Sequence, residues 1–111
     1  MKKTCIWVAA LLMACSACGE KGSVKKPDVL LSEQQMIDVL ADTYLIEGEL
    51  NHRRTVGQDV SKLQNAYYRQ LFEHYNITDT LFKQNLKYYS YHPEVLETIM
   101  DSVCSRLDKA Q

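Results

Sequence analysis

Apolar side chains recur along most of this chain at the spacing of amphipathic helices, and no stretch alternates as a strand would. The first pattern predicts a helix from Glu33 to about Arg54, because Ser32 and Gln35 form a capping box before it. Leu31 and Met36 flank this cap as a hydrophobic staple. The apolar face of the helix consists of Met36, Ile37, Val39, Leu40, Tyr44, Ile46 and Leu50.

A second helix is expected from about Val60 to Tyr75, after a turn at residues 55–58 and with Asp59 as its N-cap. Two helices joined by a short turn pack antiparallel, so the second helix should lie against the first. Its buried stripe is formed by Val60, Leu63, Tyr67, Leu71 and Tyr75, and it also includes Gln64 and His74.

The remaining pattern predicts two further helices. Thr78 or Thr80 is expected to cap a third helix that ends at Tyr89. Residues 90–92 are expected to be extended, because a proline disfavours the helical conformation of the residue before it. Pro93 suits the first position of a fourth helix, whose stripe is Val95, Leu96, Ile99, Met100, Val103 and Leu107. The sequence therefore predicts an all-α bundle of three to four helices.

Polar residues within these stripes are the candidates for buried function. Glu47 interrupts the apolar face of the first helix, where a carboxylate needs a partner. Antiparallel packing makes Gln64 the expected partner and places His74 too far from Glu47 for a catalytic dyad. Asp38 and Asp42 lie on the opposite face, and we interpret this pair as a solvated surface rather than a metal or acid–base site.

The N-terminus has the pattern of a secretory signal peptide. Lys2 and Lys3 precede a run of apolar and small residues, and Ala14 gives a small residue before Cys15. We interpret residues 1–14 as a lipoprotein signal and Cys15 as the lipidated residue. Cys18 is an alternative site because Ser16 and Ala17 suit the two positions before it, and an ordinary cleaved signal also remains open. The apolar run is too short to span a membrane, which takes roughly 20 residues.

Composition limits the rest of the chain to one domain. Removing 14 of the 111 residues leaves 97, with 11 basic against 14 acidic residues and a net charge of −3. Residues 15–26 are expected to form a flexible tether, and residues 27–111 the helical domain. Basic pairs occur only at residues 25–26 and 53–54, so nucleic acid is not expected as a partner. Cys104 is interpreted as a small buried side chain, and its pairing with Cys18 is left open.

Tyrosines gather in the second and third helices and in the turn that follows. We expect Tyr68, Tyr89, Tyr91 and His92 to form an interaction surface, because tyrosine is favoured at binding hot spots. The alternative is structural, with the rings buried at the rim of the bundle and the hydroxyls wet. This second interpretation is preferred for the remaining members of the cluster that lie on the stripes, Tyr67, Tyr75 and Tyr88. His92 is also expected to cap the fourth helix.

No recognised catalytic motif occurs, and the three histidines lack the spacing of paired metal ligands. We therefore expect a protein without enzymatic activity, metal or cofactor.

Two segments resemble a known family. Residues 27–32 followed by 36–42 look like its opening motif, and residues 88–94 with the following Leu96 and Ile99 look like its second. Together they resemble the short lipoproteins of Bacteroidota that carry a small helical domain of unknown function, over residues 27 to about 107. The resemblance implies a diacylglycerol on the cysteine thiol, a helical fold and a bacterial envelope, and it implies no reaction. Asn85 stands where this family is expected to carry serine.

These observations predict a membrane-anchored envelope lipoprotein that acts as a non-enzymatic helical protein-interaction module. Its expected partners are the lipid bilayer and another envelope protein, at an outer membrane with the domain facing the periplasm. The alternative is a small domain that binds a ligand or glycan, or an enzyme that uses Glu47 and nearby tyrosines and histidines.

Overall fold

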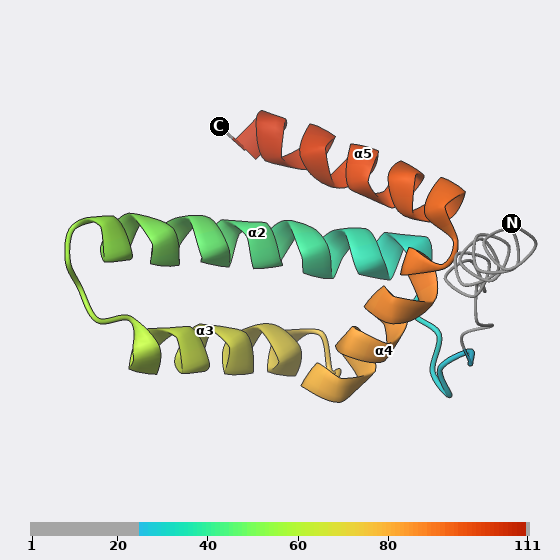
Figure 1. The fold of residues 1–111 in the computed structure, drawn as a ribbon, viewed down its shortest axis with the longest axis horizontal. Helices are drawn as coiled ribbons and strands as arrows, with labels where there is room; N and C mark the ends of the chain where they lie inside the picture. Colours follow the sequence, from blue (N-terminus) through green and yellow to red (C-terminus); the bar gives the residue numbers. More distant parts are fainter. Residues whose placement is uncertain (1–24, 111) are drawn as a thin grey trace, which may run out of the picture.

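The computed structural model describes residues 25–110, which form four helices and no strand (Figure 1). The predicted all-α fold of three to four helices is confirmed. The helices are α2 (Glu33–Thr55), α3 (Ser61–His74), α4 (Asp79–Ser90) and α5 (Pro93–Ala110). The expected signal peptide, both candidate lipidation sites and most of the expected tether lie outside the described residues.

The longest helix, α2, lies at the centre of the domain and packs against both α3 and α5 (Figure 1). α3 runs antiparallel to α2 on one side, and α5 lies on the other side with a direction similar to that of α2. α4 crosses the end of the domain where α2 begins, and it packs against α5. Because α5 is shorter than α2, it ends beside Gly48 and Glu49 and leaves the last turns of α2 uncovered on that side.

Local sequence signals explain the ends of α2. Gln35 donates its backbone N–H to the Ser32 hydroxyl at 3.1 Å, and Ser32 donates its own N–H to the Gln35 side chain at 2.8 Å. This is the predicted capping box. At the other end Gly57 has a φ of 84°, a conformation that favours glycine, and its N–H reaches the Arg54 carbonyl at 3.0 Å.

The start of α3 is one residue later than predicted, whereas α4 begins after Thr78, one of its two predicted caps. Asp59 accepts hydrogen bonds from both the backbone and the hydroxyl of Ser61, which lower the pKa of its carboxyl, and α3 begins at Ser61. Thr78 caps α4 by accepting from Leu81 at 3.0 Å. Between these helices Asn76 has a φ of 52°, which asparagine tolerates better than most residues.

The expected extended segment at residues 90–92 is wrong for two of its three residues. Ser90 is the last residue of α4, and Tyr91 follows with a near-helical φ of −88° and ψ of −1°. The proline effect reaches only the residue directly before Pro93, so α4 extends to Ser90 and Tyr91 still has a near-helical backbone. The His92 carbonyl accepts from Leu96, while its imidazole lies against the Tyr88 ring, 4.6 Å between centroids. The ring thus contacts Tyr88 and makes no hydrogen bond to the helix end among the described residues.

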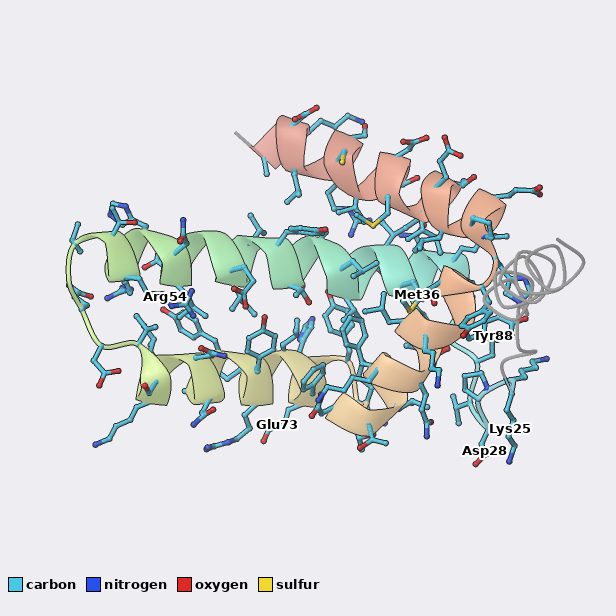
Figure 2. All side chains as sticks on the ribbon, viewed as in Figure 1. Lys25, Asp28, Met36, Arg54, Glu73 and Tyr88 are labelled. Atoms are coloured by element: carbon cyan, nitrogen blue, oxygen red, sulfur yellow. The ribbon has the colours of Figure 1, made fainter. Side chains whose placement is uncertain are left out.

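The core lies where α2, α4 and α5 meet the end of α3. Figure 2 shows the Met36 side chain between α2 and α4. The buried apolar residues of this cluster are Leu31, Met36, Val39, Leu40, Ala41, Leu71, Phe82, Tyr89, Ile99 and Val103. Cys104 is exposed, contrary to its interpretation as a buried side chain, because α5 packs on one side only and Cys104 falls beside its stripe.

One polar residue, Asn85, is 0% exposed within this core. Its carboxamide oxygen accepts from the Leu31 N–H at 2.7 Å, and its nitrogen donates to the carbonyls of Val29 and Leu81, each at 2.9 Å. Tyr89, one turn later on α4, donates its hydroxyl to the Leu31 carbonyl at 2.5 Å. Residues 29–31 are therefore fixed to α4. A serine hydroxyl has one proton and a shorter reach, so it could not make all three contacts of the Asn85 amide.

Candidate interaction surface

Two hydrogen bonds between polar side chains connect α2 to α3. Glu47 accepts a hydrogen bond from the Tyr68 hydroxyl, and Arg54 donates to the Gln64 side chain at 3.1 Å. The predicted contact between Glu47 and Gln64 is therefore wrong. In this hairpin Gln64 lies about one helical turn nearer to the loop than the residue that faces Glu47.

The Tyr68 hydroxyl is held in its neutral form. Partial burial, the hydrogen bond to Glu47 and the negative charge of that carboxylate raise its pKa to about 12. The Tyr68 ring packs beside Phe72, with centroids 6.1 Å apart, and Phe72 packs beside Phe82 at 5.9 Å. Tyr68 therefore helps to join α3 to α2 and α4.

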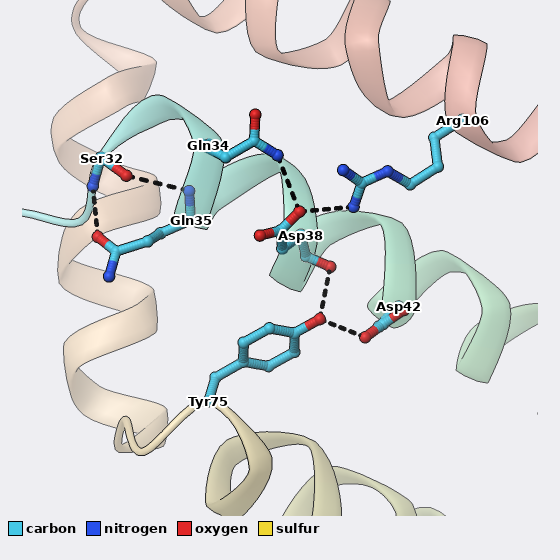
Figure 3. A network of polar contacts seen from close by, with 7 residues as sticks. All are labelled: Ser32, Gln34, Gln35, Asp38, Asp42, Tyr75 and Arg106. Atoms are coloured by element: carbon cyan, nitrogen blue, oxygen red, sulfur yellow. Dashed lines mark hydrogen bonds and ion pairs between the residues drawn. The ribbon is translucent and has the colours of Figure 1, made fainter.

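A second polar network joins α2 to α3 and α5 (Figure 3). Asp38 accepts from Arg106 at 2.6 Å and from Gln34 at 3.0 Å, while Asp42 accepts from the Tyr75 hydroxyl at 2.5 Å. Burial, the hydrogen bond to Asp42 and the charge of that carboxylate raise the pKa of Tyr75 above its usual range. Asp38 and Asp42 are half-buried and connect helices, so their interpretation as a solvated surface is wrong.

The four residues predicted as an interaction surface do not form one patch. Tyr89 is 6% exposed and its hydroxyl is bonded within the core, and this burial raises its pKa. Tyr68 is half-buried between helices. Tyr91 is 47% exposed and His92 is exposed, so these two adjacent residues lie on the surface at the junction of α4 and α5.

His74, which was expected inside the buried stripe of α3, is exposed. The buried face of this helix is turned toward Tyr68 and Phe72, because Phe72 packs against Phe82 of α4. Tyr67 and His74 then fall at the edge of the α2–α3 contact. The His74 ring meets the edge of Tyr75, with centroids 4.8 Å apart.

Beside this edge runs a groove between α2 and α3, which we call the Leu45 groove. It encloses about 390 Å³. Its walls are formed by Asp42, Leu45, Ile46, Glu49, Tyr67, Gln70, Leu71 and His74. Leu45 is 53% exposed and its neighbour Tyr44 is 48% exposed, so two adjacent large side chains lie together on the surface of α2. Sequence reasoning missed this groove, although the spacing of Asp42, Leu45, Ile46 and Glu49 is visible in the sequence.

A second groove, which we call the Phe72 groove, lies where α3 meets α4 and encloses about 580 Å³. Its walls carry aromatic rings, amides and charges of both signs, namely Thr43, Gln64, Asn65, Tyr68, Arg69, Phe72, Asp79, Phe82, Lys83 and Leu86. Glu47 is not among these residues, although its partner Tyr68 is.

Among residues 25–110, no group of three His, Cys, Asp or Glu side chains is placed to hold a metal ion. Within the same residues, no helix has the length and apolar character needed to cross a membrane.

The fold and grooves define a small all-α domain with an elongated helical hairpin. The chain belongs to the family described as "Domain of unknown function (DUF4296)", which matches residues 27–111. No curated protein and no solved structure matches the chain.

Proposed function

We propose that this chain is a lipid-anchored protein of a bacterial envelope whose helical domain acts as a non-enzymatic protein-interaction module. The observation that carries the proposal is the fixation of residues 29–31 to α4, at the end of the domain from which the α2–α3 hairpin extends (Figure 1). The Leu45 groove lies between the two helices of this hairpin. A tether that enters at that end of the domain would hold the groove near a membrane and leave it open to a partner.

The anchor rests on the N-terminal sequence pattern, with Cys15 as the proposed lipidated residue and Cys18 as the alternative. Residues 15–26 would then be the whole tether between the lipid and the domain. At the maximum extension of a chain, twelve residues span about 40 Å. Pro27 is already buried, so the folded domain begins directly after the tether. The fold would therefore begin within that distance of the bilayer.

The absence of enzymatic activity is proposed because the half-buried carboxylates form contacts between helices. Glu47 is bonded by Tyr68, Asp42 by Tyr75 and Asp38 by Arg106. Each of these contacts joins one helix to another, which is a structural task. An acid–base role for Glu47 would also require access to substrate, and Glu47 lines neither of the two grooves described above.

Proximity crosslinking of the full lipidated protein in its own membranes tests this function. The control is the double variant Cys15→Ala, Cys18→Ala, which has no thiol for the anchor at either candidate site. The proposal expects one dominant envelope protein, enriched only with the anchored chain. Equal recovery of every protein with the unanchored control would contradict it.

The proposed location is the outer membrane with the domain in the periplasm. Protease treatment of intact cells should then leave the protein whole, whereas its rapid loss would indicate display on the cell surface.

A second candidate function, binding of a small ligand or glycan, is favoured by one observation. The Phe72 groove has a volume within the range of ligand sites and combines the rings of Tyr68, Phe72 and Phe82 with amide groups. Titration of the full chain with peptidoglycan fragments, followed by calorimetry, tests this candidate. Heat that is lost in the variant Phe72→Ala, while the circular dichroism spectrum is retained, would support it. The absence of heat with any fragment would count against it.

A further inference from the structure

The Leu45 groove has the geometry of a seat for a third helix. α2 supplies Asp42, Leu45, Ile46 and Glu49, and α3 supplies Tyr67, Gln70, Leu71 and His74. In each helix these positions follow the order i, i+3, i+4 and i+7, which is one continuous face. Two such faces from antiparallel neighbours form a trough about two turns, or ~10 Å, long. An amphipathic helix can lie in such a trough and bury its apolar stripe.

The apolar part of this trough continues onto the uncovered side of α2. A notch beside the end of α5 is lined by Tyr44, Leu45, Gly48, Glu49, Leu107 and Ala110, so it shares Leu45 and Glu49 with the groove. Tyr44 is 48% exposed, and the space beside Gly48 is open to beyond 4 Å. Leu45 thus stands as a ridge between two hollows, and an apolar side chain of a partner could contact it from either side.

The charged side chains that line the groove indicate the sign of the charge expected on its partner. Asp42 and Glu49 lie seven residues apart along α2, and no lysine or arginine lines the groove. The Phe72 groove differs, because Arg69 and Lys83 line it together with Asp79. The charges that line the Leu45 groove therefore favour a cationic segment, whereas the Phe72 groove carries charges of both signs.

Both acidic side chains retain acceptor capacity for an incoming cation. Asp42 receives one hydrogen bond, from Tyr75, which leaves its other oxygen without a partner among the described residues. Glu49 pairs with Arg53 at 2.7 Å, and both side chains are well exposed. Such surface pairs are weak and exchange readily for another partner.

We propose that the Leu45 groove binds an amphipathic helix of a partner protein whose apolar stripe is flanked by lysine or arginine residues about two turns apart. This inference rests on the proposed interaction function and names the chemistry of the partner. A second copy of this chain is a poorer occupant. The cleanest apolar stripe of the chain, on α5, is already used against α2, and Arg106 beside it is paired with Asp38.

The experiment uses the full lipidated chain in nanodiscs of phosphatidylcholine and two fluorescent helical peptides. The peptides share one leucine stripe and differ only at two positions seven residues apart, which carry lysine in one peptide and glutamate in the other. Anisotropy measured with empty nanodiscs is subtracted. The lysine peptide is expected to bind about tenfold more tightly at low salt, because two exposed charge pairs contribute to that extent, and high salt should narrow the ratio.

Three variants locate the site on the protein. Glu49→Gln should reduce the preference for lysine about threefold. Glu73→Gln is the matched control, because Glu73 lies on the outer side of α3 and points away from α2 (Figure 2), and it should leave the preference unchanged. Leu45→Ser should weaken both peptides at least tenfold. Because Leu45 is half exposed, this change leaves the core intact.

The proposal is overturned if neither peptide binds, if both bind equally, or if Glu73→Gln acts like Glu49→Gln. It is also overturned if the chain alone forms a dimer that Leu45→Ser dissociates, because a second copy would then occupy the groove. An envelope partner found by crosslinking, together with any of these results, would leave the proposed function intact and reject only this groove as its site. Failure of both experiments would reject both.

Discussion

At the scale of single residues, Asn85 determines where the N-terminal segment lies. Its spacing of three residues from Phe82 on α4 is a sequence signal for the core-facing side, although it does not by itself establish burial. Its partners could not be predicted in the same way, because Val29 and Leu31 lie more than 50 residues earlier and carry no local signal of the contact. The same contact explains why Tyr89, expected at the surface, is buried.

Replacing Asn85 with alanine should destabilise the domain by about 2–4 kcal/mol, because the Leu31 N–H loses its partner in a buried site and a small cavity forms. Urea unfolding of the full chain, followed by circular dichroism, measures the change. Gln84→Ala, at an exposed neighbouring position, is the control and should have little effect. A loss no larger for Asn85→Ala than for Gln84→Ala would show that the N-terminal segment is not held by this amide.

Tyr68 predicts a dependence of stability on alkaline pH. Its pKa is about 12 in the fold and about 10 in an unfolded chain. The stabilisation that comes from the neutral hydroxyl is therefore complete below pH ~10 and is lost as the pH rises toward ~12. Tyr68→Phe should reduce the fall in unfolding free energy across this range, while Tyr91→Phe, at an exposed site, should not. An identical alkaline fall in the wild type and Tyr68→Phe would refute this assignment.

At the scale of helices, the ends are predicted well because caps, glycine and proline act within a few residues. Ser32, Gly57 and Thr78 have the roles that their sequence contexts predict. Contacts between helices are predicted less well, because a shift of one turn or a small rotation changes the partner. For this reason the predicted contact between Glu47 and Gln64 is wrong, and His74 lies at the edge of the α2–α3 contact rather than inside it.

At the contact between α5 and α2, the contribution of apolar burial to stability can be compared with that of a surface ion pair. Ile99→Ala should cost about 2–5 kcal/mol, because this side chain is 0% exposed between the helices. Arg106→Ala should cost less than about 1 kcal/mol, because its ion pair with Asp38 lies in contact with solvent. Denaturant unfolding of both variants measures the difference. A larger loss for Arg106→Ala than for Ile99→Ala would mean that the polar network, and not the apolar core, holds α5 in place.

At the scale of the whole molecule, the position of the grooves and of the exposed apolar side chains depends on which helix faces remain uncovered. The sequence indicates amphipathic helices but does not specify how far α5 extends along α2. The exposure of Tyr44 and Leu45 follows from that length, so the Leu45 groove could be recognised only in the assembled domain. The position of the N-terminal segment likewise depends on the packing of α4.

The proposed anchor predicts a specific chemical modification. Cells fed an alkyne-tagged fatty acid should label the wild type and Cys18→Ala, and Cys15→Ala should lose the label. Labelling that is lost only in Cys18→Ala would move the anchor to the alternative site. Labelling that persists in the double variant, or is absent from the wild type, would contradict a lipoprotein anchor altogether.

Site-resolved photocrosslinking in native membranes examines anchor, domain and surface together. A photoreactive side chain is placed at Gln70 in the Leu45 groove or, as the control, at exposed Thr98 on α5, in the full lipidated chain. We predict that one envelope protein is captured from Gln70, that it is not captured from Thr98, and that Leu45→Ser abolishes the capture. The same proteins captured from both positions, or none from Gln70, would contradict the account of this protein as a tethered interaction module.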